Sequence, residues 1–433
     1  MLRILIIACT VTFTLLAAGA QALTLEEALS RARETLPAYK ASLLKIKSSE
    51  ALYDASLGPY FPSLDAGAFY DKHFDSTLAG RDYTERGYNM TLSYLLFDGG
   101  KRYANRDIAR LNLASNSEEA RKQLIDLEFN VKVTFYTALA RRDSLEQKKL
   151  QLKDAQKDYE VARGRHKFGV AKLSDTLQAS VRLEQAKFNV INADGALRKS
   201  FADVNSLIGE RLDVKLALEG TLDAAPFIPA LSALQTAVLE KPEVKQAENS
   251  ISIAKNTKKI ELSAFWPTLT ADASYFWTKG GISAFSRTED RIVGLTASWN
   301  LFELGKFFRT KSAAIETDVA AERLQDVKRE LLLTVQKSFE ELITAMSKLN
   351  VAREQLKQAE YNYKQAFGEY RIGKADILSL VQAESLLADA RDQLILTQLD
   401  VQVAKAILER ASSVPRLEAL PRDTSGRSAE GPQ

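Results

Sequence analysis

The stretch GYNMTLSYLLFDGGKRYANR, residues 87–106, contains the change of pattern that decides the fold. Apolar side chains alternate with small or polar ones from Tyr88 to Leu96, which predicts a β-strand with one apolar face. After the glycine pair, no Gly or Pro occurs between Lys101 and Arg163. The sequence therefore predicts a strand followed at once by a helix that reaches on the order of 90 Å.

The same pattern occurs twice in the chain. LLFDGGKR at 95–102 returns as NLFELGKF at 300–307, and GPYFPSLDAGAFY at 58–70 returns as SAFWPTLTADASYFW at 263–277, at an offset of about 205 residues. A third match pairs KFGVAKLSDTLQA at 167–179 with RIGKADILSLVQA at 371–383. We therefore expect two tandem copies of one unit: a helix, a strand pair, a very long helix, a turn and another helix.

The predicted bounds follow from these anchors. The first copy, 23–225, has a β-hairpin at about 64–97, a long helix at about 101–166 and a helix at about 173–208. The second copy, 226–411, has a helix at about 230–263, a hairpin at about 269–302, a long helix at about 306–370 and a helix at about 376–410. Residues 412–433, which contain Pro, Gly and Ser, predict a disordered tail.

The first 22 residues predict a signal peptide, with Arg3 before an apolar segment and a small-x-small end at Ala20 to Ala22. The only cysteine, Cys9, lies in that segment, so the exported chain has no thiol chemistry. Lys and Arg number 59 against 56 Asp and Glu, and the two signs are interleaved, which argues against nucleic-acid binding. No later segment has the 18 apolar residues of a membrane-spanning helix. We expect any membrane insertion to use strands.

The strand pairs have the two faces of a transmembrane barrel. The side chains predicted to face lipid are Tyr88, Met90, Leu92 and Tyr94 in the first copy and Val293, Leu295 and Trp299 in the second. The alternative is a half-buried hairpin of a soluble domain. Since about eight strands are the fewest that close a barrel, four strands per chain require several chains, and a trimer with twelve strands is the economical solution.

The long helices predict a coiled coil. Ala345, Leu349, Ala352, Leu356 and Ala359 follow a heptad pattern, while Lys, Glu, Gln and Asp occupy the other faces. Such helices need partners. A long exported coiled coil also fits a periplasmic adaptor or a structural rod protein, for which the hairpins would be soluble.

The chain contains few residues of the kinds that enzymes use for catalysis. The two histidines, His73 and His166, fall in a predicted loop and a predicted turn, and no nucleotide-binding or metalloprotease motif occurs. We therefore assign no catalytic residue, metal or cofactor.

The order of these motifs resembles one family. The mature start LTLEEAL, the YFPSL and LLFDGGK junctions and the stretch YRIGKADILSLVQAESLLADARDQL, spanning Leu23 to about Arg410 together, are similar to the TolC-type outer-membrane efflux proteins. The resemblance implies a homotrimeric channel-tunnel in outer-membrane lipid of a Gram-negative bacterium, with a helical tube crossing the periplasm. It also implies a periplasmic adaptor (membrane fusion protein) and an inner-membrane RND, ABC or MFS pump, in tripartite efflux or type I secretion.

The resemblance also implies a gate at the turns between the paired helices. The family's closing tyrosine falls on Tyr370, its aspartate on Asp175 and the neighbouring hydroxyl on Ser174. A phenol–carboxylate hydrogen bond contributes about 1.5–3 kcal/mol, enough to bias a gate. On pattern alone, Tyr370 equally completes the heptad seam.

Two departures from the family pattern stand nearby. The gate arginine falls on Ala375, with Arg371 and Lys374 at adjacent positions. The constriction-lining positions that carry aspartates in the best-known members are Ser379 and Gln382, so strong cation block is not expected.

The turns themselves are the predicted adaptor-docking tips. The residues concerned are Gly169, Val170, Ala171, Gly373, Lys374 and Ala375. Their glycines tolerate positive φ, so a plain hairpin turn is the simpler interpretation.

Overall fold

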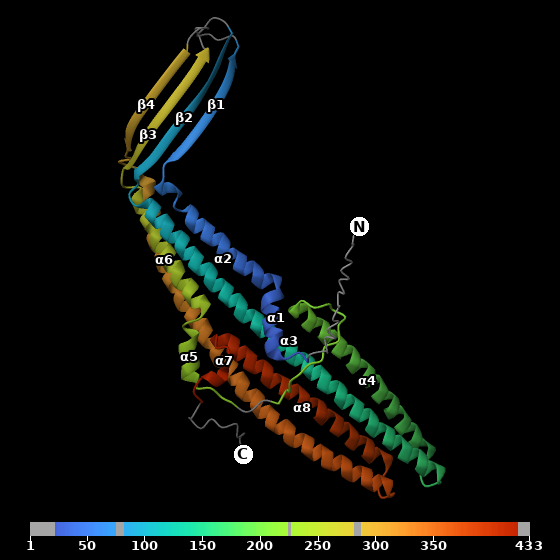
Figure 1. Ribbon diagram of the computed structural model, residues 1–433. Helices are drawn as coiled ribbons and strands as arrows, with labels where there is room; N and C mark the ends of the chain where they lie inside the picture. The colour runs from blue at the N-terminus through green and yellow to red at the C-terminus, as the bar shows by residue number, and fades with distance from the viewer. Residues whose placement is uncertain (1–21, 75–81, 224–226, 281–286, 423–433) are drawn as a thin grey trace, which may run out of the picture.

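The computed structural model describes residues 22–74, 82–223, 227–280 and 287–422. A curved β-sheet lies at one end of the molecule, and long helices extend from the sheet to the opposite end (Figure 1). The prediction of a mainly helical chain with one small sheet and an internal two-fold repeat is confirmed. The predicted signal peptide, apart from Ala22, and residues 423–433 lie outside the described ranges.

The sheet is an antiparallel meander of four strands in the order β1-β2-β3-β4. Strands β1 (Ser63–His73) and β2 (Tyr83–Phe97) come from the first copy, and β3 (Thr268–Gly280) and β4 (Arg287–Ser298) from the second. Strand β2 pairs with β3, so one sheet joins the two copies.

Four helices form the long part of the molecule. Helices α3 (Lys101–Lys167) and α4 (Leu173–Ile208) pack as one antiparallel pair, α7 (Leu304–Arg371) and α8 (Ile377–Ser412) pack as the other, and α8 also packs on α3 (Figure 1). Among the described residues, no helix combines the length and the apolar character needed to cross a membrane.

Two broken helices precede the hairpins. Helices α1 (Leu25–Thr35) and α2 (Pro37–Ala55) lead to β1 through a short 3-10 turn, η1 (Gly58–Tyr60), and α5 (Leu231–Val238) and α6 (Pro242–Ser263) lead to β3. The prediction of one helix over 230–263 was therefore wrong. Pro242 begins α6, because proline lacks the N–H that a continuous helix would use there.

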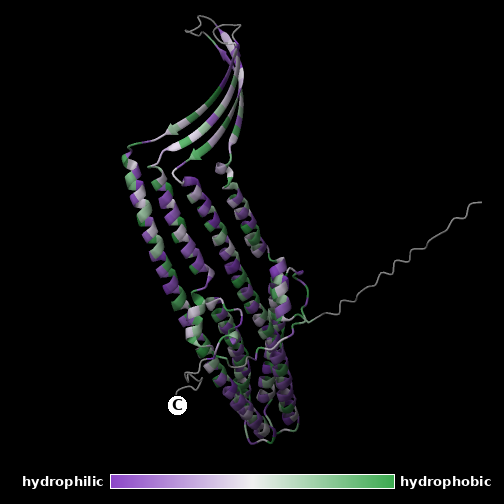
Figure 2. Cartoon of the chain, turned by 60° about the vertical axis from the view of Figure 1, so that its left-hand side comes forward, coloured by the Kyte–Doolittle hydropathy of each residue, from purple (hydrophilic) through white to green (hydrophobic). Residues whose placement is uncertain are grey.

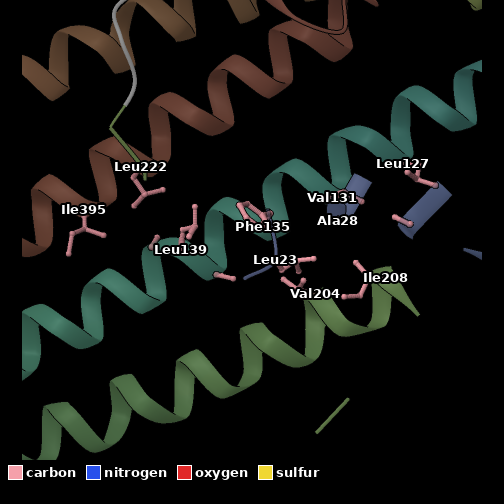
Figure 3. Close-up of a cluster of buried hydrophobic side chains, with 13 residues drawn as sticks. Leu23, Ala28, Leu127, Val131, Phe135, Leu139, Val204, Ile208, Leu222 and Ile395 are labelled. Atoms are coloured by element: carbon pink, nitrogen blue, oxygen red, sulfur yellow. The ribbon is translucent and has the colours of Figure 1, made fainter. Parts of the chain in front are cut away.

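Buried apolar side chains gather where the broken helices cross the long ones. In the first cluster, Phe135 and Leu139 of α3 meet Val204 and Ile208 of α4, together with Leu23 from the start of the mature chain (Figure 3). A second cluster joins α5, α7 and α8 around Phe339. The first cluster thus belongs mainly to the first copy, with Ile395 of α8 added from the second, and the second cluster belongs to the second copy.

The start of the C-terminal tail differs from the prediction. Leu417, in the 3-10 turn η2 (Leu417–Ala419), is fully buried in the second cluster, and the Ala230 N–H donates to the Pro421 carbonyl at 2.8 Å. The expectation of disorder from residue 412 was wrong for residues 413–422, because Leu417 and Leu420 fill the space beside α5.

Candidate functional site

The strand register sorts side chains onto two faces of the sheet. Directly opposite residues of antiparallel strands point to the same side, and Leu64, Leu92, Ala273 and Val293 form one such row across the sheet. We call this side the apolar face; its other residues include Ala66, Ala68, Tyr88, Met90, Tyr94, Ala271, Tyr275, Trp277 and Leu295. Figure 2 shows the resulting alternation of hydrophobic and hydrophilic residues along the strands.

The opposite side, the polar face, carries mostly small and polar groups. Ser93 donates a 2.7 Å hydrogen bond to Asp272, its directly opposite residue. In the described strands this face has five carboxylates and no Lys or Arg; the carboxylates are Asp65, Asp71, Glu85, Asp272 and Asp290. Such a face suits water.

Both faces and both edges of the sheet are open in the single chain. Val293 is 87% exposed and Leu295 66% exposed, and β1 and β4 each have a strand partner on one side only among the described residues. Exposed apolar rows and unpaired backbone edges favour association. Association removes the apolar side chains from water and gives the edge N–H and C=O groups hydrogen-bond partners.

The structure places the predicted lipid-facing residues on the apolar face, with one exception. Tyr88, Met90, Leu92 and Tyr94 in β2 and Val293 and Leu295 in β4 share that face. Trp299 lies one residue beyond β4, where its indole N–H donates to the Phe265 carbonyl at 3.1 Å. Its assignment to a strand was wrong: the ladder ends at the Thr268–Ser298 pair, since Pro267 has no N–H to extend it.

Buried polar side chains fix the junctions between sheet and helices. Asp98 accepts hydrogen bonds from the N–H groups of Gly100 and Arg102, at 3.0 and 2.8 Å. In the second copy, the buried ammonium of Lys306 donates to the Ala264 and Asn300 carbonyls, at 2.6 and 2.9 Å. These contacts hold each long helix beneath its strand.

At the far end, Tyr370 is almost completely buried and its hydroxyl has no hydrogen-bond partner. The Arg165 guanidinium lies 4.4 Å from the centre of its ring and also donates to the Tyr370 carbonyl. Burial raises the pKa of Tyr370, nearby Arg165 opposes that shift and Asp175 adds to it. The hydrogen bond from Tyr370 to Asp175 that the resemblance implies is therefore not made in this structure.

The other predicted gate and constriction residues lie around the turns. Ser174 donates to Asp175 at 3.3 Å, and Ser379 donates both its N–H and its hydroxyl to Asp376, which caps α8. The remaining positions, Arg371, Lys374 and Gln382, have exposed side chains.

The predicted tips are exposed turns. Gly169 and Gly373 have φ of 72° and 81°, the left-handed region that glycine tolerates. Val170 is 63% exposed, Lys374 is exposed and Ala171 and Ala375 are half-buried.

Sequence reasoning missed a second contact one heptad above the tip. The Tyr363 hydroxyl donates to Asp158 at 3.2 Å; Asp158 and Arg165 are seven residues apart on α3, as Tyr363 and Tyr370 are on α7. Burial is the main reason that the pKa of Asp158 is raised to about 7, and the negative charge of Glu384 is the second reason. The 205-residue repeat offset was the available signal, because both contacts join equivalent positions of the two copies.

A two-faced sheet with open edges, set on paired helices with exposed turns, defines the class of outer-membrane channel-tunnels. The chain belongs to the outer membrane efflux protein family, whose model matches residues 28–210 and 233–413. Its place is the outer membrane of a Gram-negative bacterium, from which it extends into the periplasm, and its role lies in efflux or export. Family members are channel proteins that work with adaptors and inner-membrane pumps.

Similar proteins span nearly the full length. Protein CyaE of Bordetella pertussis is 23% identical, over 91% of this chain and 85% of its own. The pyoverdine export outer membrane protein OpmQ of Pseudomonas aeruginosa is 22% identical, over 88% of this chain and 83% of its own. The solved structure of CusC matches with a TM-score of 0.77 at 16% identity, covering 90% of this chain and 91% of CusC.

Proposed function

We propose that three copies of this chain close a twelve-stranded barrel in the outer membrane, continued by a helical tunnel, and that this trimer is the passive exit duct of a tripartite efflux or type I secretion system. The apolar face then contacts lipid and the polar face lines the channel. A periplasmic adaptor and an inner-membrane RND, ABC or MFS pump supply docking and energy.

The register of the sheet carries this proposal. One face is apolar across all four strands at the Leu64–Leu92–Ala273–Val293 row, while both sheet edges stay open. In lipid each unpaired backbone group costs several kcal/mol, so the edges of β1 and β4 must be paired. Pairing β4 of one copy with β1 of the next closes the ring, and three copies supply twelve strands.

Closure of the tunnel is the second part of the proposal. Tyr370, Asp175 and Ser174 lie at the end where α3 meets α7, with Arg371 and Lys374 exposed beside them. We assign these residues to the gate, and Ser379 and Gln382 to the constriction lining. In the closed form, Arg165 holds the ring and carbonyl of Tyr370.

The adaptor contacts the two turns in this proposal. Gly169, Val170 and Ala171 form one tip, and Gly373, Lys374 and Ala375 form the other. Both turns are largely exposed, and a Cβ added at Gly373 would contact only the Arg165 guanidinium, at 3.6 Å, so both backbones are accessible to another helical hairpin.

Disulfide crosslinking between β1 and β4 of neighbouring chains tests whether three chains close the barrel. Since Cys9 is the only cysteine and lies in the predicted signal peptide, introduced cysteines are the only thiols of the mature chain. Asp65→Cys in β1 is combined in turn with Asp290→Cys, Ile292→Cys and Gly294→Cys in β4. We expect one combination to give a crosslinked ladder that ends at the trimer.

The matched control uses an intrachain pair. Asp65 and Thr91 are directly opposite in β1 and β2, so Asp65→Cys with Thr91→Cys should crosslink within one chain and stay monomeric on a denaturing gel. The wild-type trimer should also conduct ions in a planar bilayer. A ladder that ends at the dimer, or a mature chain recovered in the soluble fraction, would overturn the proposal.

A further inference from the structure

Three cations form a row across the loop end of the apolar face. Arg86 of β2 is directly opposite Lys279 of β3, and Lys279 is directly opposite Arg287 of β4. Lys72 and Arg291 project from the same face nearby along their strands. All five side chains are exposed.

This row is electrostatically unfavourable on its own. Neighbouring strands lie about 4.8 Å apart, and like charges directly opposite each other destabilise a sheet. Glu289 pairs with Arg287 at 3.2 Å and with Arg291 at 3.4 Å. In the described part of the chain, no carboxylate lies within ion-pair distance of Arg86 or Lys279. Among the described residues, the row thus has an excess of positive charge, which an external anion would neutralise.

The charges are sorted by face and not merely placed near loops. Within the described strands, the polar face has five carboxylates and no Lys or Arg, whereas the apolar face has five Lys and Arg and one carboxylate, Glu289. A loop end that needed only solubility would have cations on both faces. The cations stand on the side that meets lipid.

Aromatic rings mark the depth of this row in a bilayer. Tyr88 and Trp277 stack at 5.3 Å in the adjacent row of the same face, as aromatic residues do at membrane interfaces. Along β2, six residues separate Leu92, in the row that is apolar on all four strands, from Arg86, in the row of cations. This separation is about 20 Å along the strand at 3.3 Å per residue. Arg86, Lys279 and Arg287 thus lie one row beyond these rings, at the level of lipid headgroups in the proposed barrel, whereas Arg291, opposite Tyr275, lies two rows closer to the helices.

We propose that Arg86, Lys279 and Arg287 form a docking surface for the phosphate groups of anionic glycolipid headgroups in the outer leaflet. The inference rests on the proposed barrel, which turns the apolar face to lipid. Guanidinium groups bind phosphate oxygens with two parallel hydrogen bonds, and the ammonium of Lys279 adds a point charge. The row extends over two strand spacings, about 10 Å, so a headgroup with two phosphates fits better than one with a single phosphate.

Titration of the detergent-purified trimer tests this surface. The probe is deep-rough lipopolysaccharide, which carries two phosphates on its lipid anchor, and native mass spectrometry counts the molecules bound per trimer. We expect Arg86→Gln with Lys279→Gln to weaken apparent binding roughly 25-fold, about fivefold for each charge removed. Phosphatidylcholine should bind wild type and variant equally, and excess inorganic phosphate should not displace the glycolipid.

Two controls separate charge from folding. Arg86→Lys with Lys279→Arg should keep wild-type binding, and Lys337→Gln with Lys348→Gln, at exposed positions of α7, should leave it unchanged. Wild-type binding by the Arg86→Gln, Lys279→Gln trimer would overturn the docking surface, as would displacement by free phosphate. A chain that forms no conducting trimer would instead refute the proposed function.

Discussion

The Tyr363 hydroxyl donates a 3.2 Å hydrogen bond to Asp158, a residue 205 positions earlier in the chain. The second carboxylate oxygen of Asp158 is buried without a partner, and Glu384 and Asp154 add negative charge around it, with Lys157 opposing them. The contact between α3 and α7 therefore depends on the protonation state of one carboxyl group.

Asp158→Asn should stabilise the chain above neutral pH. The folded-state pKa of Asp158, about 7, lies above the usual value of 3.8, so the folded chain binds more protons than the unfolded one between those limits. Stability falls as pH rises through that window. The asparagine variant should match wild type near pH 4 and gain on the order of 2 kcal/mol at pH 8. Thermal unfolding followed by circular dichroism checks this; equal gains at both pH values would contradict it.

Arg165→Gln should loosen the contact between α3 and α7 beside the turns. The change removes the cation–π contact with Tyr370 and a charge-assisted hydrogen bond to its carbonyl, together about 2 kcal/mol. If the proposed gate is correct, the open fraction in single-channel recordings rises at least tenfold. Lys167→Gln removes the same charge from an exposed position and serves as the control. An identical open fraction in both variants would exclude a closing role for Arg165.

In the proposed gate, Tyr370→Phe should leave the closed state nearly unchanged, because the Tyr370 hydroxyl has no hydrogen-bond partner. Asp175→Asn tests the family-implied partner in the same recordings. A large rise in conductance with Tyr370→Phe would show that the hydroxyl is bonded in the closed trimer.

Asp98→Ala should cost about 1–2 kcal/mol of stability, since it leaves the N–H groups of Gly100, the N-cap residue of α3, and of Arg102, in its first turn, without their acceptor. Glu303 occupies the equivalent position of the second copy but pairs with Arg309 at 2.9 Å, on the surface. Glu303→Ala should therefore cost less than 1 kcal/mol. Chemical denaturation of both variants gives the comparison, and equal losses would refute the capping role.

Leu417→Ala should destabilise the middle of the molecule by about 2–4 kcal/mol, because it opens a cavity beside α5 and α7. The neighbouring Arg416 has a largely exposed side chain, so Arg416→Ala is the matched control. Melting temperatures of the two variants that agree within error would show that residues 413–422 contribute nothing to the core.

The faces of the sheet could be predicted from the sequence, because a strand has a period of two residues and each wrong register would move Leu92 or Val293 to the other face. The end of β4 could not be read from the alternation alone, since Trp299 fits the pattern and only the partner strand ends the ladder. Proline often begins a helix, so Pro242 was a signal for the break between α5 and α6. The apolar spacing on both sides of Pro242 is that of a helix, and it favoured one continuous helix instead.

The side-chain contacts that join the two copies near the turns could not be predicted from sequence patterns. Asp158 lies in a mixed-charge run that resembles a solvated face, and Tyr363 fits the heptad seam. Their meeting depends on how α3, α7 and α8 pack together, which no local pattern specifies. The hydrogen bond expected at Tyr370 failed for a related reason: Arg165, which follows Asp158 by one heptad, covers the ring instead.

Strands β2 and β3 belong to different copies but to one polypeptide, so the seam between them forms as an intramolecular event. In the proposed trimer, three of the six seams between copies are secured in this way by covalent tethering, and the other three depend on encounter between subunits. Dilution should therefore slow ring closure without disturbing the pairing inside each subunit. A half-length chain would have to bring six subunits together in place of three, so the two-copy polypeptide needs fewer encounters to complete the ring.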